Sequence, residues 1–399
     1  MIEHNNIPKN WRIVELKDVV SILGDGLHGT PKYSDSGDYF FINGNNLCDG
    51  RIIIKNNTKR VTKEEYEKYK KPLNENTILV SINGTLGNIA YYRNEKVILG
   101  KSACYFNVLE TIDKKYLSIL LSGLHFFNYA NNSATGSTIK NVSLKAMREF
   151  NVPLPPLPEQ QAIVSKIEEL LSELENGKQQ LQIAQQQLKV YRQSLLKWAF
   201  EGKLTNKDVK EGELPKRWKW VKLGQSTVNF DGKRIPLSRE VRSKRKGEYR
   251  YYGATEIVDY IDNYIFDGIF LLIGEDGANL VTKSRPLAFI AEGKFWVNNH
   301  AHVLQTKSNV NLKFLCHYFN SLNLSQFVTG SAQPKLTQAN LNKILVPLPP
   351  LEEQRHIVDE LESKLTVCDK IEETISQSLK QAETLRQSIL KKAFEGKLI

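Results

Sequence analysis

The side chains in this sequence that are best suited to a chemical task are cations, and they are densest between residues 233 and 250. Eight lysines and arginines lie in this segment, opposed only by Glu240 and Glu248. Cations beside the phosphates of a nucleic acid release counterions, which gives salt-sensitive affinity with little dependence on sequence. The alternative is a solvated loop. The candidates for DNA contact in this segment are Lys233, Arg234, Arg242, Lys244, Arg245, Lys246, Tyr249 and Tyr251.

A second group of polar residues could read the edges of bases. In the major groove, arginine and lysine pair with guanine, and asparagine and glutamine pair with adenine. Such residues must lie on exposed turns, and for each of them an ordinary role in a turn is the alternative. The candidates among residues 1–150 are Asn43, Asn45, Asn46, Lys101, Ser102, Thr138 and Lys140. The candidates among residues 205–345 are Lys283, Arg285, Asn298, Asn299, His300, His302, Gln333 and Lys335.

The patterns that resemble enzyme sites are incomplete. The Gly-Lys-Ser string at residues 100–102 would end a phosphate-binding loop, but position 95, where that loop needs glycine, is Glu95. His300 and His302 could share a strand face, yet no cysteines or carboxylates with ligand spacing surround them in the sequence. Glu275 and Asp276 read best as part of a turn. No Asn-Pro-Pro-aromatic run and no glycine-rich cofactor fingerprint occurs, so the sequence predicts no catalytic residue, metal site or cofactor in this chain.

Length and composition limit the elements that could position these side chains. At roughly 100–200 residues per domain, the 399 residues predict two or three domains. The chain is 41% hydrophobic, which suits a globular protein, and its net charge of +11 favours a polyanionic partner. No apolar run reaches the roughly 18 residues of a membrane helix. The four cysteines lie too far apart to indicate a zinc site or a disulfide framework, and we expect a cytoplasmic protein.

The sequence contains two strings that recur at one offset. Val-Pro-Leu-Pro-Pro-Leu stands at residues 152–157 and again at 346–351, and Ala-Phe-Glu-Gly-Lys-Leu stands at 199–204 and again at 393–398. The offset is 194 residues in both cases, since 346 − 152 and 393 − 199 are equal. The interval between the strings keeps its length but few of its identities. This pattern indicates two rods of fixed length within an internal repeat.

Apolar residues follow alternating steps of four and three along both rods, which is the spacing of a coiled-coil seam. Gly177 should cost about 1 kcal/mol inside a helix, so we expect the two helices to pair with each other rather than to form a homodimer. An antiparallel pair needs no long crossover between the helices. We also expect Trp198, Phe200 and Phe394 to pack on the adjacent globules. The predicted seam residues are Ile163, Ile167, Leu170, Leu174, Leu181, Leu188, Leu195, Ile357, Leu361, Ile371, Ile375, Leu385 and Ile389.

Residues 1–150 and 205–345 read as two globules of one fold. Both begin with a Pro-Lys-x-Trp string, at residues 8–11 and 215–218, and both end near a Gly-Ser pair, at 136–137 and 330–331. Their short apolar runs, Asn-Gly and Asp-Gly turns and few helical stretches indicate an α+β fold. The predicted architecture is two α+β domains at opposite ends of an antiparallel two-helix coiled coil, with pseudo-twofold symmetry. Residues 151–204 and 346–399 supply the coil.

This duplicated order resembles the DNA specificity subunit of type I restriction–modification systems. The motifs are a proline-rich lead-in ending in Glu159-Gln160 or Glu353-Gln354, a long helix and a Phe-Glu-Gly-Lys-Leu terminus, each following a globule. The resemblance implies that residues 1–150 and 205–345 are target-recognition domains, each of which reads half of a split asymmetric site in double-stranded DNA. It also implies that residues 151–204 and 346–399 are conserved helical regions, which fix the spacer between the half-sites.

The resemblance further implies a noncatalytic subunit that docks two methyltransferase subunits, with restriction/translocase subunits joining the complex. S-adenosylmethionine, ATP and magnesium are then expected in those partners. Two other interpretations stay open. The chain could be a coiled-coil adaptor between proteins without specific DNA binding, or an enzyme whose site is unrecognised. A steep dependence of DNA affinity on salt would argue against the adaptor.

Overall fold

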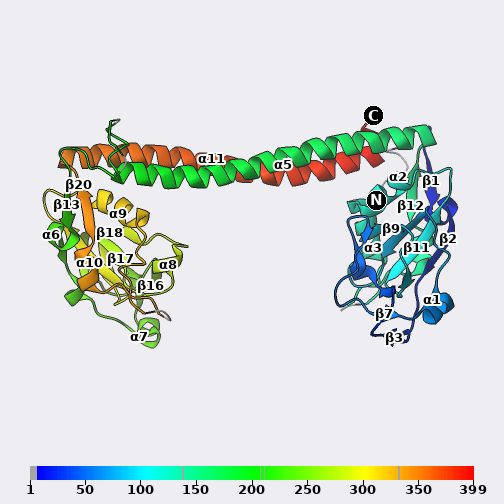
Figure 1. Ribbon diagram of the computed structural model, residues 1–399, viewed down its shortest axis with the longest axis horizontal. Helices are drawn as coiled ribbons and strands as arrows, with labels where there is room; N and C mark the ends of the chain where they lie inside the picture. Colours follow the sequence, from blue (N-terminus) through cyan, green and yellow to red (C-terminus); the bar gives the residue numbers. More distant parts are fainter. Residues whose placement is uncertain (1–6, 137–138, 207, 211, 331–332) are drawn as a thin grey trace. The chain divides into compact units, whose positions relative to one another are not determined.

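The computed structural model of the chain describes residues 7–136, 139–206, 208–210, 212–330 and 333–399 (Figure 1). Its contacts divide the chain into two compact units, residues 1–181 with 377–399 and residues 182–376. Each unit contains one globule and one part of each of two long helices, α5 (Leu157–Phe200) and α11 (Leu351–Phe394). None of the helices in these described ranges is long and apolar enough to cross a membrane.

The first globule is built on an antiparallel sheet in the order β2 (Val20–Asp25), β11 (Ala103–Val108), β8 (Thr77–Ser81), β9 (Ile89–Tyr91). Strands β8 and β11 are buried throughout, because both faces of the sheet are covered. Ile78 and Phe106 face a core shared with helices α2 (Lys114–Ser122), α3 (Leu124–Ser133) and α4 (Leu144–Arg148). Leu79 and Tyr105 face a second core.

The second core lies under a smaller sheet in the order β10 (Val97–Leu99), β4 (Tyr39–Ile42), β7 (Arg60–Val61), β3 (Tyr33–Ser34). The remaining short elements of this globule are η2 (Leu16–Val19), η3 (Gly44–Asn46), β5 (Leu47–Cys48), β6 (Arg51–Ile52) and α1 (Lys63–Tyr69).

The second globule is built on one six-stranded sheet in the order β14 (Thr227–Asn229), β19 (Ala301–Thr306), β17 (Phe266–Gly274), β18 (Ala288–Val297), β15 (Lys246–Tyr252), β16 (Ile257–Ile261). Only β15 and β18 pair in parallel among these strands. Helix α9 (Leu312–Ser321) covers the sheet through Phe314 and Leu315. The other elements are α6 (Leu223–Ser226), η4 (Asp231–Lys233), α7 (Arg239–Lys244), α8 (Asn279–Thr282) and α10 (Gln338–Lys343). The prediction of α+β globules is confirmed.

The proline-rich strings form strands that close each globule. Strand β12 (Asn151–Leu154) pairs antiparallel with β1 (Arg12–Glu15), and β20 (Leu345–Leu348) pairs antiparallel with β13 (Lys219–Lys222). The registers correspond, since Arg12 lies opposite Leu154 and Lys219 lies opposite Leu348. A two-stranded ribbon has a free edge at which proline is tolerated. The proline-rich lead-in before each long helix is therefore extended in both copies.

Each long helix begins with a buried glutamine that ties it to its globule. In the first unit, Gln160 accepts a hydrogen bond from the backbone N–H of Asp113 at 2.8 Å and donates to the Pro155 carbonyl at 2.9 Å. In the second unit, Gln354 accepts from the N–H of Asn311 at 2.7 Å and donates to the Pro349 carbonyl at 2.8 Å. Asp113 and Asn311 are the N-caps of α2 and α9. We call Gln160 and Gln354 the glutamine clamps.

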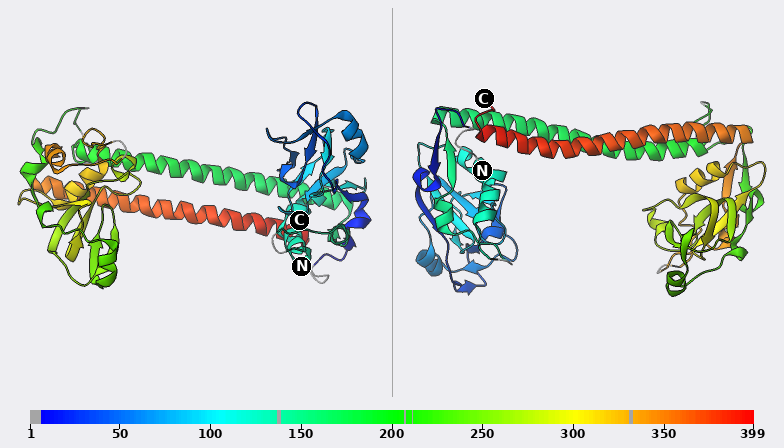
Figure 2. Two further views of the ribbon diagram at one scale, coloured as in Figure 1. Left: turned by 90° about the horizontal axis from the view of Figure 1, so that it is seen from below. Right: turned by 180° about the vertical axis from the view of Figure 1, so that it is seen from behind.

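The two long helices run side by side and antiparallel within each unit (Figure 2). In the first unit, Lys178 of α5 donates to Glu383 of α11 at 2.8 Å. In the second unit, Arg192 of α5 donates to Asp369 of α11 at 2.6 Å. Fourteen residues forward on α5, from 178 to 192, thus correspond to fourteen residues backward on α11, from 383 to 369. The predicted antiparallel pairing is confirmed.

The composition of the seam differs from the prediction at two positions of α11. Ile371 and Leu385 were expected inside, but 43% and 51% of their surface is exposed. On α5, the half-buried Lys178 and Arg192 also turn toward α11, where their long apolar stems pack while their charged ends pair with acids. Predicted positions that are buried are Ile163, Ile167, Leu188, Leu195, Ile357, Leu361, Ile375 and Ile389, and those that are half-buried are Leu170, Leu174 and Leu181.

The aromatic residues at the helix ends were predicted to pack on the globules. Phe200 lies 5.2 Å from Phe314 of α9, measured between ring centroids, and Phe394 lies 5.4 Å from Tyr116 of α2. For these two residues the prediction is confirmed. It is wrong for Trp198, whose side chain is 41% exposed, because this position lies on the outer side of α5.

Candidate nucleic-acid interface

Loops of the first globule are tied together where β2 and β8 end and β11 begins. The backbone N–H of Lys101 donates to the Leu27 carbonyl at 3.0 Å, that of Ile82 to the Ser102 carbonyl at 3.0 Å, and that of Val142 to the Ile82 carbonyl at 2.8 Å. These bonds are consistent with antiparallel strands whose ends meet at one side of the sheet. We call residues 25–28, 82–84, 100–102 and 139–141 the first loop edge.

The first loop edge contains some of the residues that the sequence singled out. Lys101 and Lys140 are exposed on it, and the Ser102 hydroxyl donates to the Asn43 side chain at 3.0 Å. Asn45 is exposed nearby on η3. Asn46 was expected on an exposed turn, which is wrong: it is buried, and its amide donates to the Ile53 carbonyl at 2.9 Å. Thr138 lies outside the described residues.

The second globule has an equivalent set of loops. The N–H of Glu275 donates to the His300 carbonyl at 2.8 Å, and the N–H of Leu336 donates to the Glu275 carbonyl at 2.7 Å. The N–H of Val303 donates to the Asp231 carboxylate at 2.8 Å. We call residues 231–234, 275–277, 298–302 and 333–336 the second loop edge. Isolated bridges at equivalent positions, Asn83 with Asn141 and Asp276 with Lys335, show that the two edges share a backbone pattern.

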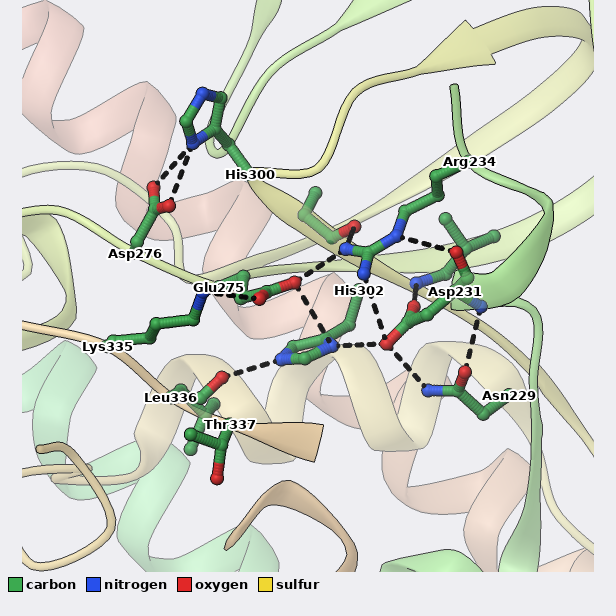
Figure 3. Close-up of polar contacts among 12 residues, drawn as sticks. Asn229, Asp231, Arg234, Glu275, Asp276, His300, His302, Lys335, Leu336 and Thr337 are labelled. Carbon is green, nitrogen blue, oxygen red and sulfur yellow. Dashed lines mark hydrogen bonds and ion pairs between the residues drawn. The ribbon is translucent and has the colours of Figure 1, made fainter. Parts of the chain in front are cut away.

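The second loop edge brings together four predicted residues in two groups of polar contacts, of which the pair of His300 and Asp276 is the smaller (Figure 3). Arg234 donates to Glu275 at 2.6 Å, and Lys335 contacts the other oxygen of Glu275 at 3.1 Å. His302 lies 2.6 Å from Asp231, and His300 lies 2.8 Å from Asp276. His300 and Lys335 are about half exposed, whereas His302 is buried. Asn299 and Gln333 are exposed on the same edge.

Three predicted DNA contacts in this globule have buried side chains, so the exposed turns expected for Asn298 and His302 are wrong. Asn298 accepts a hydrogen bond from the N–H of His300 at 2.8 Å. The Tyr251 hydroxyl accepts from the N–H of Leu237 at 2.9 Å. His302 lies between Asp231 and the Leu336 carbonyl. Each of these polar groups is hydrogen-bonded inside the globule.

Most cations of the segment 233–250 are paired with acids. Asp259 forms ion pairs with both Arg242 and Lys246. Hydrogen bonding to Lys246 is the main reason why the pKa of Asp259 is lowered. Arg245 pairs with Asp262 at 2.8 Å and Lys244 with Glu240 at 2.9 Å. Asp259 lies on β16, which pairs with β15, and Asp262 lies just after β16. Strand pairing thus brings acids beside the basic segment, and this surface carries less unpaired positive charge than the sequence of the segment suggests.

The remaining candidates are spread over the second globule. Lys233 is exposed with its ammonium 5.3 Å from the Phe230 ring, and half-buried Tyr249 packs on Tyr264. Lys283 contacts the Ser321 carbonyl, and burial lowers its pKa. Arg285 pairs with Glu256. Lys283 and Arg285 line a groove of about 790 Å³ beside α5 rather than the second loop edge.

The sequence reading missed the carboxylates that organise the second loop edge. Burial opposes ionisation of Asp231, but hydrogen bonds from His302, Val303 and Asn229 outweigh it and lower the pKa of Asp231. Burial likewise opposes ionisation of Glu275, and Arg234 with its neighbours lowers that pKa. The available signal was that an Asp-Gly string follows Phe230 and that a Glu-Asp-Gly string follows the apolar run at residues 269–273.

Asp231, Glu275 and His302 also have the residue types of a metal site, with ligand atoms within 4.8 Å of one another. The donor set does not fit a cation. The facing His302 nitrogen already bonds Asp231, and Arg234 supplies positive charge to Glu275 at 2.6 Å. A further cation here would meet guanidinium and imidazole groups, so the cluster is an ion-pair network.

Comparison with known proteins identifies relatives along most of the chain. Residues 8–185 and 215–381 match a family model described as a type I restriction modification DNA specificity domain. A provisionally named type I restriction enzyme specificity subunit of Haemophilus influenzae is 39% identical over 145 residues, which are 36% of each chain. The type I restriction enzyme EcoprrI specificity subunit of Escherichia coli is 27% identical over 72% of this chain and 71% of its own.

Solved structures share the fold of this chain. The HsdS subunit from Thermoanaerobacter tengcongensis aligns over 98% of both chains with a TM-score of 0.66 and 20% identity. A chain from a structure concerned with complex assembly and conformational transition of the type I R-M system aligns with a TM-score of 0.70 and 19% identity, over 98% of this chain and 99% of that one.

Proposed function

Because the chain belongs to the family of type I restriction–modification DNA specificity subunits, we propose that its two globules read the two halves of a split asymmetric site in double-stranded DNA. The chain is a noncatalytic component of such a system. In this proposal residues 1–150 and 205–345 are the target-recognition domains, and residues 151–204 and 346–399 are the helical regions that connect them.

The observation that carries the proposal is that one backbone pattern presents different side chains in the two globules. Lys101, Ser102 and Lys140 lie on the first loop edge, where Arg234, His300 and Lys335 lie on the second. Lysine and arginine suit guanine or phosphate, and hydroxyl and amide groups suit other base edges. Two edges of equal construction and unequal chemistry would read two different sequences.

The long helices supply the spacing in this proposal. Both contain 44 residues, and their antiparallel pairing is fixed by ion pairs in both units. If both domains approach the same face of the duplex, half-sites about one helical turn apart, near 34–36 Å, are expected. The spacer should then follow the length of the paired helices.

The partners would be two methyltransferase subunits and restriction/translocase subunits. An apolar stripe on the outer side of α5, made of Ile183, Val190, Tyr191 and Trp198, is 40–63% exposed and lines a shallow groove of about 480 Å³. Apolar helix faces of this kind accept a partner helix. S-adenosylmethionine, ATP and magnesium would be bound by those partners in the cytoplasm.

The test is to reconstitute the chain with its methyltransferase partner and map methylated adenines in a library of random duplexes. We expect one split motif with a fixed spacer, and a logarithmic plot of affinity against salt with a steep negative slope. Exchanging residues 205–345 for those of a relative should change one half of the motif only. A complex that shows neither a motif nor a salt dependence would instead support a coiled-coil adaptor.

A further inference from the structure

The imidazole of His302 is 1% exposed and has an oxygen acceptor at each ring nitrogen. Nδ1 lies 2.6 Å from the Asp231 carboxylate, and Nε2 lies 2.8 Å from the Leu336 carbonyl. A carbonyl can only accept, so Nε2 carries a proton. Asp231 also only accepts, since Val303 N–H and the Asn229 amide both donate to it. Both ring nitrogens of the buried His302 therefore face oxygen atoms of other residues, so the ring is held from two sides.

The charges around His302 are contributed by several segments. Asp231 follows β14, Glu275 follows β17 and lies 3.7 Å from Nδ1, and Arg234 bonds Glu275 at 2.6 Å. Lys335 closes the network at the surface, 3.1 Å from Glu275 with half its side chain exposed. Arg234, Lys335 and the His302 imidazole thus face two carboxylates, Asp231 and Glu275. Lys335 is the most exposed of the three.

The same network holds the backbone of residues 333–337. The His302 ring donates to the Leu336 carbonyl, and the Leu336 N–H donates to the Glu275 carbonyl at 2.7 Å. Both backbone polar groups of Leu336 are therefore tied to strand ends of the sheet. Thr337, the next residue, caps α10 by accepting from the N–H of Asn340. The segment that carries Gln333 and Lys335 is thus fixed immediately after these exposed side chains.

The first globule has the same backbone bonds without the buried histidine and glutamate. Cys104 lies opposite Val80 and Asp25, as His302 lies opposite Ile273 and beside Asp231. Ile82 accepts from the N–H of Val142, as Glu275 accepts from the N–H of Leu336. Cys104 and Ile82 are buried apolar residues. The fold therefore does not require the ionic network, and its presence in the second globule calls for another explanation.

We propose that His302 and Glu275 are positioning residues that set how the second globule presents Gln333 and Lys335 to double-stranded DNA. The inference rests on the proposed function and adds residues that determine the specificity of one half-site. Arg234 is shared between Glu275 and the Ala301 carbonyl at 2.7 Å, so it has little freedom to turn toward other acceptors. Lys335 is held at one oxygen of Glu275, with its ammonium at the surface.

The decisive variant replaces the network with the apolar pair of the first globule, His302→Cys together with Glu275→Ile. It removes the imidazole and one carboxylate and uses residues that this fold already accommodates at the equivalent positions. The complex with methyltransferase is titrated with duplexes in which single base pairs of either half-site are changed. An arginine or lysine contact to a base contributes about 10- to 100-fold in discrimination. We expect a loss of that size in one half-site, with the other unchanged.

The controls separate this inference from a folding defect and from failure of the proposed function. Cys104→Ala alters the equivalent position of the first globule and should leave discrimination in the second half-site unchanged. Glu275→Gln, which is isosteric and keeps an acceptor for Arg234, should give a smaller loss in the same half-site. Wild-type discrimination in both half-sites by the double variant would overturn the inference. A wild-type complex that discriminates in neither half-site would overturn the proposed function instead.

Discussion

The glutamine clamps lead to a prediction about how the helices are joined to the globules. Gln354 is fully buried and makes hydrogen bonds to the N–H of Asn311 at 2.7 Å and to the carbonyls of Pro349 and Asn309 at 2.8 and 3.1 Å. Leucine has nearly the same volume, so Gln354→Leu would open no large cavity. It would leave these backbone groups without a partner where water has poor access.

The size of the effect follows from the number of groups left unpaired. A buried donor or acceptor without a partner costs about 1–3 kcal/mol. The N–H of Asn311 and the Pro349 carbonyl are the most enclosed, and the added apolar burial of leucine offsets part of the loss. We therefore expect the free energy of unfolding of the second unit to fall by about 3 kcal/mol. For a unit of this size the melting temperature should fall by about 6–12 °C.

Hydrogen exchange followed segment by segment can locate the effect. Gln354→Leu should speed exchange in α9, which Asn311 caps, by about 100-fold, and should leave α2 unchanged. Gln160→Leu should do the reverse, because Gln160 bonds the cap of α2. Gln161→Leu, at the exposed neighbouring position, should change stability by less than about 0.5 kcal/mol. If α9 in the Gln354→Leu protein exchanged at the wild-type rate, the clamp would have no structural role.

Three further predictions concern the spacer, acid stability and assembly. Deleting residues 178–184 together with 377–383 removes one matched heptad, about 10 Å of coil, so methylation mapping should show a spacer shorter by about three base pairs. The pKa values of Asp231 and Glu275 are lowered, so the folded state binds fewer protons than the unfolded state. The stability that these two carboxylates contribute is therefore present at neutral pH and is lost as the pH falls through and below their ordinary pKa values of 3.8 and 4.5. Urea unfolding from pH 7 to pH 3 should show less acid sensitivity in the His302→Cys, Glu275→Ile protein. Trp198→Ala should weaken binding of one methyltransferase subunit by about 10- to 30-fold in native mass spectrometry, with Gln182→Ala, at another exposed position of α5, as the unaffected control.

The sequence could predict features that depend on order along the chain. The repeated strings fixed the existence, equal length and antiparallel pairing of the helices, because those follow from the offset and from short connections. The ionic network could not be predicted, since His302 bonds Asp231 and Leu336, which lie 71 and 34 residues away. The same reason applies to the basic segment, whose neutralising acids Asp259 and Asp262 are brought close by strand pairing. Burial of Asn46 and Asn298 likewise depends on surrounding loops.

Apolar residues of α5 that lie outside its contact with α11 indicate a second contact face on this helix. A helix whose apolar residues fill two adjacent stripes packs against more than one neighbour. In α5, one stripe is covered by α11, while Tyr191 and Trp198 of the other are 43% and 41% exposed. The repeat places Leu385 and Lys392 of α11 at the equivalent positions. A methyltransferase subunit that binds equivalent faces of the two helices would therefore meet an aromatic face on α5 and a more polar face on α11, so the loss of Trp198 should reduce occupancy from two partner subunits to one rather than prevent assembly.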